Sequence, residues 1–299
     1  MEYTIKAFQP VANTGNSLVA RSDVSVVEAE GRLALLKDNP ESLCPALWRN
    51  CVKKVFLNDR RLLNKEDWRN LDEFSDARSD FHGGLDAFKG SFTEEQKYVF
   101  QVSYSQFRQA SVSFAIMGIE NRALIFTVLG DLVLFIYERI PNRMTAYCSM
   151  LSPSGIFDFS QPCHGLTSWG ELVGAPVTRR IPLSDAVVFV TTRDLANWVI
   201  ESSSADLPAT MGILSSLAGQ TDFESFINKI NPKLMYEGAP INKEQVSLGM
   251  IHIQAEKPME ADGAITSWMK THKHIIVIVS VLILVICALI AVFLSTFDK

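Results

Sequence analysis

The sequence lacks the short motifs that would assign it to several common enzyme classes. It contains no G-x-S-x-G, no phosphate-loop glycine signature and no H-E-x-x-H, so nothing indicates a serine hydrolase, a P-loop nucleotide-binding protein or a zinc protease. Its cysteines are odd in number and show neither C-x-x-C nor zinc-finger spacing, which indicates reduced and mostly buried thiols. They are Cys44, Cys51, Cys148, Cys163 and Cys287.

A basic, aromatic-interleaved stripe is also missing. Together with a net charge of −5, this argues against a nucleic-acid partner. The N-terminal MEYTIKAFQP is polar and lacks the central apolar region of a signal peptide, so we expect no secretion. His164 and His252 each stand alone in the sequence, which favours structural over catalytic roles.

One apolar segment is long enough to span a membrane. Ile275–Leu294 is a run of twenty mostly aliphatic residues, which matches a hydrocarbon core of ~30 Å at ~1.5 Å per residue. Lys270 and Lys273 precede it, and only five residues follow. Because basic flanks stay cytoplasmic, we expect a single-pass, tail-anchored membrane protein with a cytoplasmic N-terminal domain. The expected organisation is a domain over 1–256, a linker over 257–274, a transmembrane helix over 275–294 and a short tail over 295–299.

The centre of the chain, Ala110–Tyr137, predicts β-structure. Three apolar runs, rich in β-branched and aromatic residues, are separated by Glu120–Arg122 and by Gly130-Asp131. These breaks are too short for a crossover helix, so we expect an antiparallel meander of three strands. The near-continuous hydrophobicity indicates that both faces are covered.

Helices and further strands are predicted on both sides of this centre. Upstream we expect three strands, at Leu18–Ala20, Val24–Val27 and Leu33–Leu36. They are followed by a helix with the apolar stripe Leu43, Leu47, Cys51 and Val55, a polar exposed helix and long loop over 57–93, and a further helix over Glu94–Phe107. Downstream we expect an irregular region, a strand running into a helix, two helices and a last strand: 138–182, 185–195, Asp206–Leu217, Asp222–Ile230 and Val246–Ile253. This order predicts an α+β fold, a four-layer sandwich of two antiparallel β-sheets flanked by helices, plus one C-terminal transmembrane helix.

Two elements of the centre carry a resemblance to a known family. Ala110-Ser111-Val112 and Leu129-Gly130-Asp131 stand where the PPM-type (type 2C-like) metal-dependent Ser/Thr phosphatases have G-[AS]-T and V-G-D. The chain therefore resembles that family over most of residues 1–256. The resemblance implies paired sheets with two divalent ions, Mn or Mg, held by aspartates at strand ends.

The metal-site positions of that family are mostly altered here. Asp38 matches the aspartate of D-G-x-G-G, although Asn39 replaces the first glycine; the rival Asp80–Gly84 matches by letter but follows no apolar strand, and we interpret it as a loop. Arg193 stands in place of the aspartate of T-D-G-L, with Asp194 one residue off, and Glu244 lies near the last strand where the family has D-[DN]-x-[TS]. Upstream, Ser17 and Ala12 replace the family's metal-linked aspartate and phosphate-binding arginine.

We therefore interpret Asp38, Arg193, Asp194 and Glu244 as vestigial metal-site positions, with no catalytic residues and no cofactor. An arginine ~4 Å from a metal ion costs several kcal/mol even at an effective dielectric constant of ~20. The hypothesis that follows is that Arg193 fills the vacated position and pairs with Asp38.

Three functions remain open on this sequence. The first is a membrane-tethered, catalytically inactive phosphatase-like domain that binds a protein partner, phosphorylated or not. The second is a divergent active phosphatase that uses Asp38, Asp194 and Glu244 with Mn or Mg. The third is a tail-anchored tether whose soluble domain is unrelated to phosphatases.

Overall fold

The computed structural model describes the chain in segments, which together form one compact unit ending at Gln254. The described residues are 2–9, 24–39, 44–90, 93–95, 97–98, 110–150, 165–182, 185–230, 235–236, 239–240 and 246–254. Residues 255–299 form a second unit, outside the described residues.

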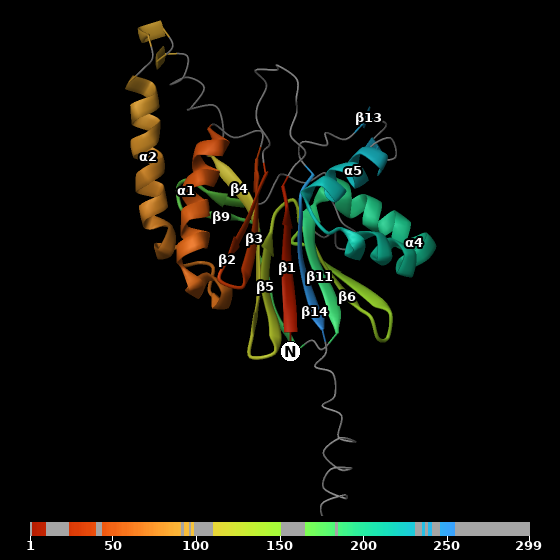
Figure 1. The fold of residues 1–299 in the computed structure, drawn as a ribbon. Helices are drawn as coiled ribbons and strands as arrows, with labels where there is room; N and C mark the ends of the chain where they lie inside the picture. Colours follow the sequence, from red (N-terminus) through yellow and green to blue (C-terminus); the bar gives the residue numbers. More distant parts are fainter. Residues whose placement is uncertain are drawn as a thin grey trace, which may run out of the picture. The chain divides into compact units, whose positions relative to one another are not determined.

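Two antiparallel sheets form the centre of the first unit (Figure 1). One sheet has the order β1-β14-β11-β6-β7, with the bounds Glu2–Phe8, Leu248–Gln254, Ala186–Thr192, Leu132–Glu138 and Arg143–Tyr147. The other has the order β10-β5-β4-β3-β2, with the bounds Val177–Pro182, Ala123–Leu129, Ser111–Glu120, Arg32–Asp38 and Val24–Ala29. Two short strands extend this second sheet beside β4: β8 (Gly165–Thr167) and β9 (Leu172–Val173).

Helices cover the outer face of each sheet (Figure 1). α1 (Pro45–Asn58) and α2 (Ser75–Gly90) pack on the β2–β5 sheet, joined by the 3₁₀ turns η1 (Arg60–Asn64) and η2 (Asp72–Phe74). α4 (Arg193–Ser216), which is kinked at Asp206, and α5 (Gln220–Ile230) pack on the β1–β14 sheet. A small ribbon is formed by β12 (Met235–Tyr236) and β13 (Ala239–Pro240). The predicted mixed α+β fold with two antiparallel sheets is confirmed.

The hydrophobic core has three parts, one between the sheets and one under each pair of helices. Alternation along β3 shows how one strand serves two of them: Leu33 and Leu35 lie between the sheets, whereas Ala34 and Leu36 lie under α1. Every residue of β3 is buried, which explains why such strands are apolar at nearly every position.

The predicted three-strand meander is wrong at its last step. β4 pairs with β5, but β6 pairs with β11 and β7 in the other sheet. The chain crosses between the sheets at Gly130, whose φ of 87° suits a residue without a Cβ atom. Hydrophobicity indicates that a strand is covered on both faces, but it does not indicate which sheet covers it.

Several local predictions are also corrected. β1 was not predicted, although Tyr3, Ile5 and Ala7 alternate with polar residues. The region 138–182 is not irregular, because it contains β7, β8, β9 and β10. Asp80–Gly84 lies inside α2 rather than in a loop.

The first helix buries a face one position away from the predicted stripe. Trp48, Val52 and Phe56 are its buried residues at four-residue spacing, while Leu47 is only partly buried. Cys44 precedes the helix as its N-cap residue, with a left-handed φ of 52°, and packs partly buried against the same hydrophobic cluster as Cys51.

Some predictions fall on parts of the chain that the structure leaves undescribed. These are the segments Leu18–Ala20, Ile275–Leu294 and most of Glu94–Phe107, and the residues Ala12, Ser17, Glu244, His164, Cys163 and Cys287. Among the helices that the structure does describe, none combines the length and the apolar character needed to cross a bilayer.

Candidate functional site

Strand ends from both sheets meet at one end of the first unit. β3 ends at Asp38, β11 ends at Thr192, and β6 begins directly after Asp131. Thr192 pairs with Leu132 in the β11–β6 register. Arg193 follows Thr192 and is the first residue of α4, and Asp131 precedes Leu132. The pairing of Thr192 with Leu132 therefore brings Arg193 beside Asp131.

Four charged side chains form a cluster at this end, which we call the inter-sheet cluster: Lys37, Asp131, Arg193 and Asp194. Lys37 Nζ donates a hydrogen bond to Asp131 Oδ2, and both side chains are about nine-tenths buried. Arg193 Nε lies 3.8 Å from Asp131 Oδ1 and 3.8 Å from Asp194 Oδ1. The cluster thus combines two cations with two carboxylates, so its formal charges balance.

Hydrogen bonds of the backbone hold the turn that carries Asp131. The N–H of Asp131 donates to Ser113 Oγ at 3.1 Å, and the N–H of Gly130 donates to Ser149 Oγ at 2.7 Å. Ser113 belongs to β4 of the other sheet, so this turn is tied to both sheets. The position of the Asp131 carboxylate is therefore fixed by the fold.

Asp38, the best match to the metal aspartate of the family, faces away from this cluster. Its Oδ2 accepts a hydrogen bond from Arg49 Nη1 of α1 at 2.9 Å, and its side chain is 1% exposed. Neighbouring residues of a strand point to opposite faces, so Lys37 follows Leu35 toward the space between the sheets while Asp38 follows Leu36 toward α1. The structure thus gives Asp38 the partner Arg49, and it places Arg193 beside Asp131 and Asp194.

Burial controls the ionisation of the acidic and thiol groups near the cluster. Desolvation raises the pKa of Asp194, although Lys37 and Arg193 oppose the shift. Desolvation also raises the pKa of the Cys148 thiol to about 11, and the nearby Asp131 adds to this shift. A thiol with a raised pKa is protonated and unreactive at neutral pH, so Cys148 is a core residue.

The residues described do not fit a pair of divalent metal ions. Such ions need several carboxylate or carbonyl oxygens each, but within the described segments no three His, Cys, Asp or Glu side chains are grouped closely enough to bind one. In addition, Lys37 takes one oxygen of Asp131, and Arg193 stands beside both carboxylates of the cluster.

Solved structures share this arrangement of sheets and helices, whereas no family model and no curated protein matches the sequence. The catalytic domain of the serine threonine protein phosphatase PstP in complex with 2 manganese ions superposes with a TM-score of 0.50 and 10% identity, over 85% of this chain and 98% of that one. The Mycobacterium tuberculosis phosphatase PstP/Ppp gives a TM-score of 0.43 at 9% identity, covering 85% and 98%. PppA of Pseudomonas aeruginosa gives 0.43 at 9%, covering 84% and 96%.

The chain has the fold of a PPM-type phosphatase catalytic domain. At 10% identity the likeness extends to the fold and not to the chemistry. The soluble domain of the third function considered above therefore also has this phosphatase-like fold.

The structure also shows two buried basic residues that the sequence patterns did not single out. Lys37 and Arg49 each neutralise a buried carboxylate, yet neither lies at a position that the family motifs mark. The only sequence signal for Lys37 was its place at the end of an otherwise apolar strand, where a buried lysine requires a partner.

Proposed function

We propose that this protein is a catalytically inactive phosphatase-like domain that acts by binding a protein partner. The observation that carries the proposal is the hydrogen bond from Lys37 to Asp131, with Arg193 beside it. These basic side chains supply the positive charge that divalent ions supply in metal-dependent phosphatases. The PstP catalytic domain, whose fold is similar, is a complex with two manganese ions.

Electrostatics and ligand chemistry both support the loss of catalysis. A unit positive charge ~4 Å from a second cation costs several kcal/mol at an effective dielectric constant of ~20. Metal-dependent hydrolysis also needs an ion to activate the attacking water. A cluster that is already neutral provides neither excess negative charge for metal ions nor excess positive charge for a phosphate group.

Manganese titration of the full-length chain tests the proposal. We expect no saturable change in the thermal unfolding temperature up to millimolar Mn²⁺, and no hydrolysis of p-nitrophenyl phosphate or a phosphoserine peptide. The double variant Lys37→Ala/Arg193→Asp removes both cations and adds a carboxylate, so it is expected to gain a Mn²⁺-dependent rise in that temperature. Lys54→Ala, which removes an exposed lysine of α1, is the control and is expected to gain nothing.

The opposite result has a clear meaning. If the unaltered chain binds Mn²⁺ and hydrolyses either substrate, and Asp131→Asn abolishes the hydrolysis, the protein is a divergent active phosphatase. If Arg193→Asp alone gains Mn²⁺ binding, the guanidinium of Arg193 is by itself sufficient to prevent metal binding in the unaltered chain.

We further propose that Ile275–Leu294 anchors the domain on the cytoplasmic side of a membrane. The length and apolar character of the segment, and the preceding Lys270 and Lys273, support this. We expect the chain to resist alkaline extraction from membranes, and its N-terminal domain to be digested by protease added from the cytoplasmic side. The double variant Leu282→Lys/Ile286→Lys costs about 5 to 7 kcal/mol of insertion free energy, so it is expected to release the protein from the membrane. If alkaline treatment extracts the unaltered chain, the proposal is contradicted.

A further inference from the structure

Exposed apolar side chains gather on the hairpin of β8 and β9. Trp169 is 55% exposed and Val173 is 44% exposed. Single exposed apolar residues are ordinary, whereas neighbouring ones mark interaction surfaces. Tryptophan is also among the residues that contribute most to binding energy at protein interfaces.

Hydrogen bonds hold Trp169 on a defined turn. The N–H of Gly170 donates to the Thr167 carbonyl at 3.0 Å, and the N–H of Ser168 donates to the Ala110 carbonyl at 2.7 Å. Gly170 has a φ of 82°, and a Cβ atom there would lie 1.9 Å from Arg78 Nη1. A side chain that is already positioned loses less conformational entropy when it binds.

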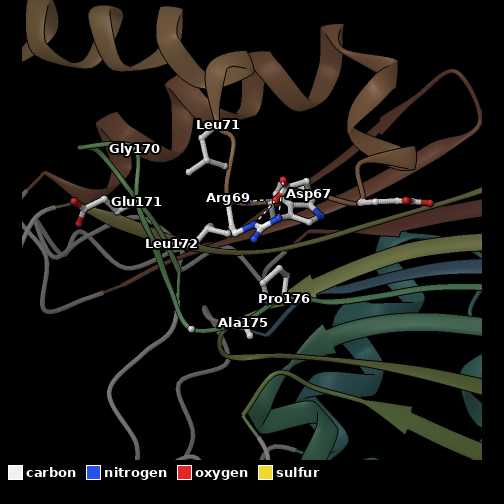
Figure 2. A pocket seen from close by; sticks show the side chains of 11 residues that line it. Asp67, Arg69, Leu71, Gly170, Glu171, Leu172, Ala175 and Pro176 are labelled. Atoms are coloured by element: carbon white, nitrogen blue, oxygen red, sulfur yellow. Dashed lines mark hydrogen bonds and ion pairs between the residues drawn. The ribbon is translucent and has the colours of Figure 1, made fainter.

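A pocket of about 750 Å³ lies beside this turn. Figure 2 shows one wall formed by the segment that carries Asp67, Arg69 and Leu71, and the other by the segment from Gly170 to Pro176. Its apolar lining residues are Trp68, Leu71, Leu172, Ala175 and Pro176. A pocket of this size accommodates a large apolar side chain.

The rim of the pocket is acidic. Arg69 Nε donates to Asp67 Oδ1 at 2.9 Å, the contact drawn in Figure 2, and this bond lowers the pKa of Asp67 to about 2. These two charges cancel, which leaves Glu66 and Glu171 as the net charge of the lining residues. Both are exposed, so a basic group on a ligand complements them.

From these features we infer that the Trp169 turn and the adjacent pocket bind an extended protein segment. Such a segment places an aromatic or aliphatic side chain in the pocket and a lysine or arginine against Glu66 and Glu171. The net negative charge of the lining residues disfavours nucleic acids and anionic lipids. Trp169 lies next to the lining residue Gly170 in the chain and is 55% exposed. The inference rests on the partner-binding part of the proposed function and assigns it a site, whereas it does not depend on the loss of catalysis.

Peptide display on the full-length chain, kept in nonionic detergent, tests the inference. The probe is a library of random twelve-residue peptides, and enriched peptides are then labelled and titrated by fluorescence anisotropy. We expect enriched sequences to join an apolar residue to lysine or arginine. Trp169→Ala and Glu171→Lys are each expected to weaken binding by about tenfold or more.

Matched substitutions on the opposite helical layer provide the control. Ile213→Ala removes another exposed apolar side chain, and Glu201→Lys reverses another exposed carboxylate, both on α4. They are expected to change the affinity less than about twofold, since they lie outside the pocket. Thermal unfolding of all four variants reports their folding, and phosphatase assays on them address the proposed function separately.

Three results would overturn the inference. They are an absence of enriched peptides, enriched peptides without a basic residue, and binding that responds equally to the α4 controls. In the last case the partner surface lies on α4 and α5 instead.

Discussion

Arg49 of α1 donates a hydrogen bond from Nη1 to Oδ2 of Asp38 at 2.9 Å, and both side chains are at least nine-tenths buried. This bond joins the first helix to the end of β3 at a position where the family resemblance implies a metal ligand. A guanidinium group neutralises this carboxylate.

Loss of Arg49 should destabilise the fold strongly. Arg49→Ala leaves the Asp38 carboxylate buried without its cation, and breaking a buried pair in this way costs about 3 to 5 kcal/mol. Lys54→Ala is a matched control on the same helix, because Lys54 Nζ also lies 2.9 Å from a carboxylate, that of Asp80, but on the exposed surface. The control should cost about 0 to 1 kcal/mol.

Denaturant unfolding monitored by circular dichroism measures both free energies. Similar values for the two variants would show that burial adds nothing to the Arg49–Asp38 pair. The double variant Arg49→Ala/Asp38→Asn should recover part of the lost stability, because it removes the uncompensated charge.

Asp194 should make stability fall as the pH rises. Its pKa is raised in the folded state by burial, so the folded state favours the protonated form. The resulting stabilisation is complete below the unfolded pKa of about 3.9 and is lost as the pH rises through the raised folded value. Asp194→Asn should therefore be more stable than the unaltered chain at pH 7, and the difference should shrink toward pH 4.

Unfolding free energies at pH 4 and pH 7 test this sign. A loss of stability in Asp194→Asn at pH 7 would mean that the attraction to Lys37 and Arg193 outweighs desolvation.

His252 should produce the opposite dependence. It lies in β14 between β1 and β11, and burial, with Lys6 and Arg139 nearby, lowers its pKa to about 4. A lowered pKa in a base favours the neutral form, so its contribution is complete above the unfolded value near 6.5 and is lost as the pH falls toward 4. In this interval, His252 of the unaltered chain takes up about one proton on unfolding, so the free energy of unfolding falls as the pH falls. His252→Gln should remove this contribution from the slope of the unfolding free energy against pH.

Carboxylates also titrate in this pH interval, both in the variant and in the unaltered chain. The contribution of His252 is therefore measured as the difference between the two slopes. An unchanged slope in His252→Gln would show that His252 is protonated equally in the folded and unfolded states.

Two buried tryptophans should respond differently to the same substitution. Trp48 Nε1 donates to the Leu166 carbonyl at 2.8 Å, whereas Trp68 Nε1 is buried without a hydrogen-bond partner among the described residues. Trp48→Phe removes a hydrogen bond, while Trp68→Phe removes a donor that has no hydrogen-bond partner among the described residues. We expect Trp48→Phe to cost about 0.5 to 1.5 kcal/mol more, because that is the net contribution of a typical hydrogen bond.

Equilibrium denaturation of both variants measures this difference, and the two substitutions remove the same atoms from side chains of similar burial. Equal costs would indicate that packing, and not the hydrogen bond, determines the contribution of Trp48.

Local patterns in the sequence predicted the buried central strands and the main helices, but not the edge strands β1, β7 and β10 or the short strands β8 and β9. The buried strands β5 and β6 are apolar at nearly every position, because both of their faces are covered. The family motifs correctly located Gly130-Asp131 and Arg193-Asp194 at strand ends, because each follows directly from a strand and its turn. β1 was missed, since its outer residues are polar and its pairing with β14 joins the two ends of the domain.

The identity of each charge partner was decided by the tertiary structure. Lys37 and Asp131 are 94 residues apart in the chain, and no local pattern relates them. The crossing of the chain from β5 to β6, in the sheet that contains β11, brings Asp131 to Lys37, and the alternation of β3 turns Asp38 toward Arg49. Sequence alone thus determined that carboxylates and basic residues lie at the strand ends, while strand pairing determined which of them meet, because side-chain direction depends on register and register depends on distant segments.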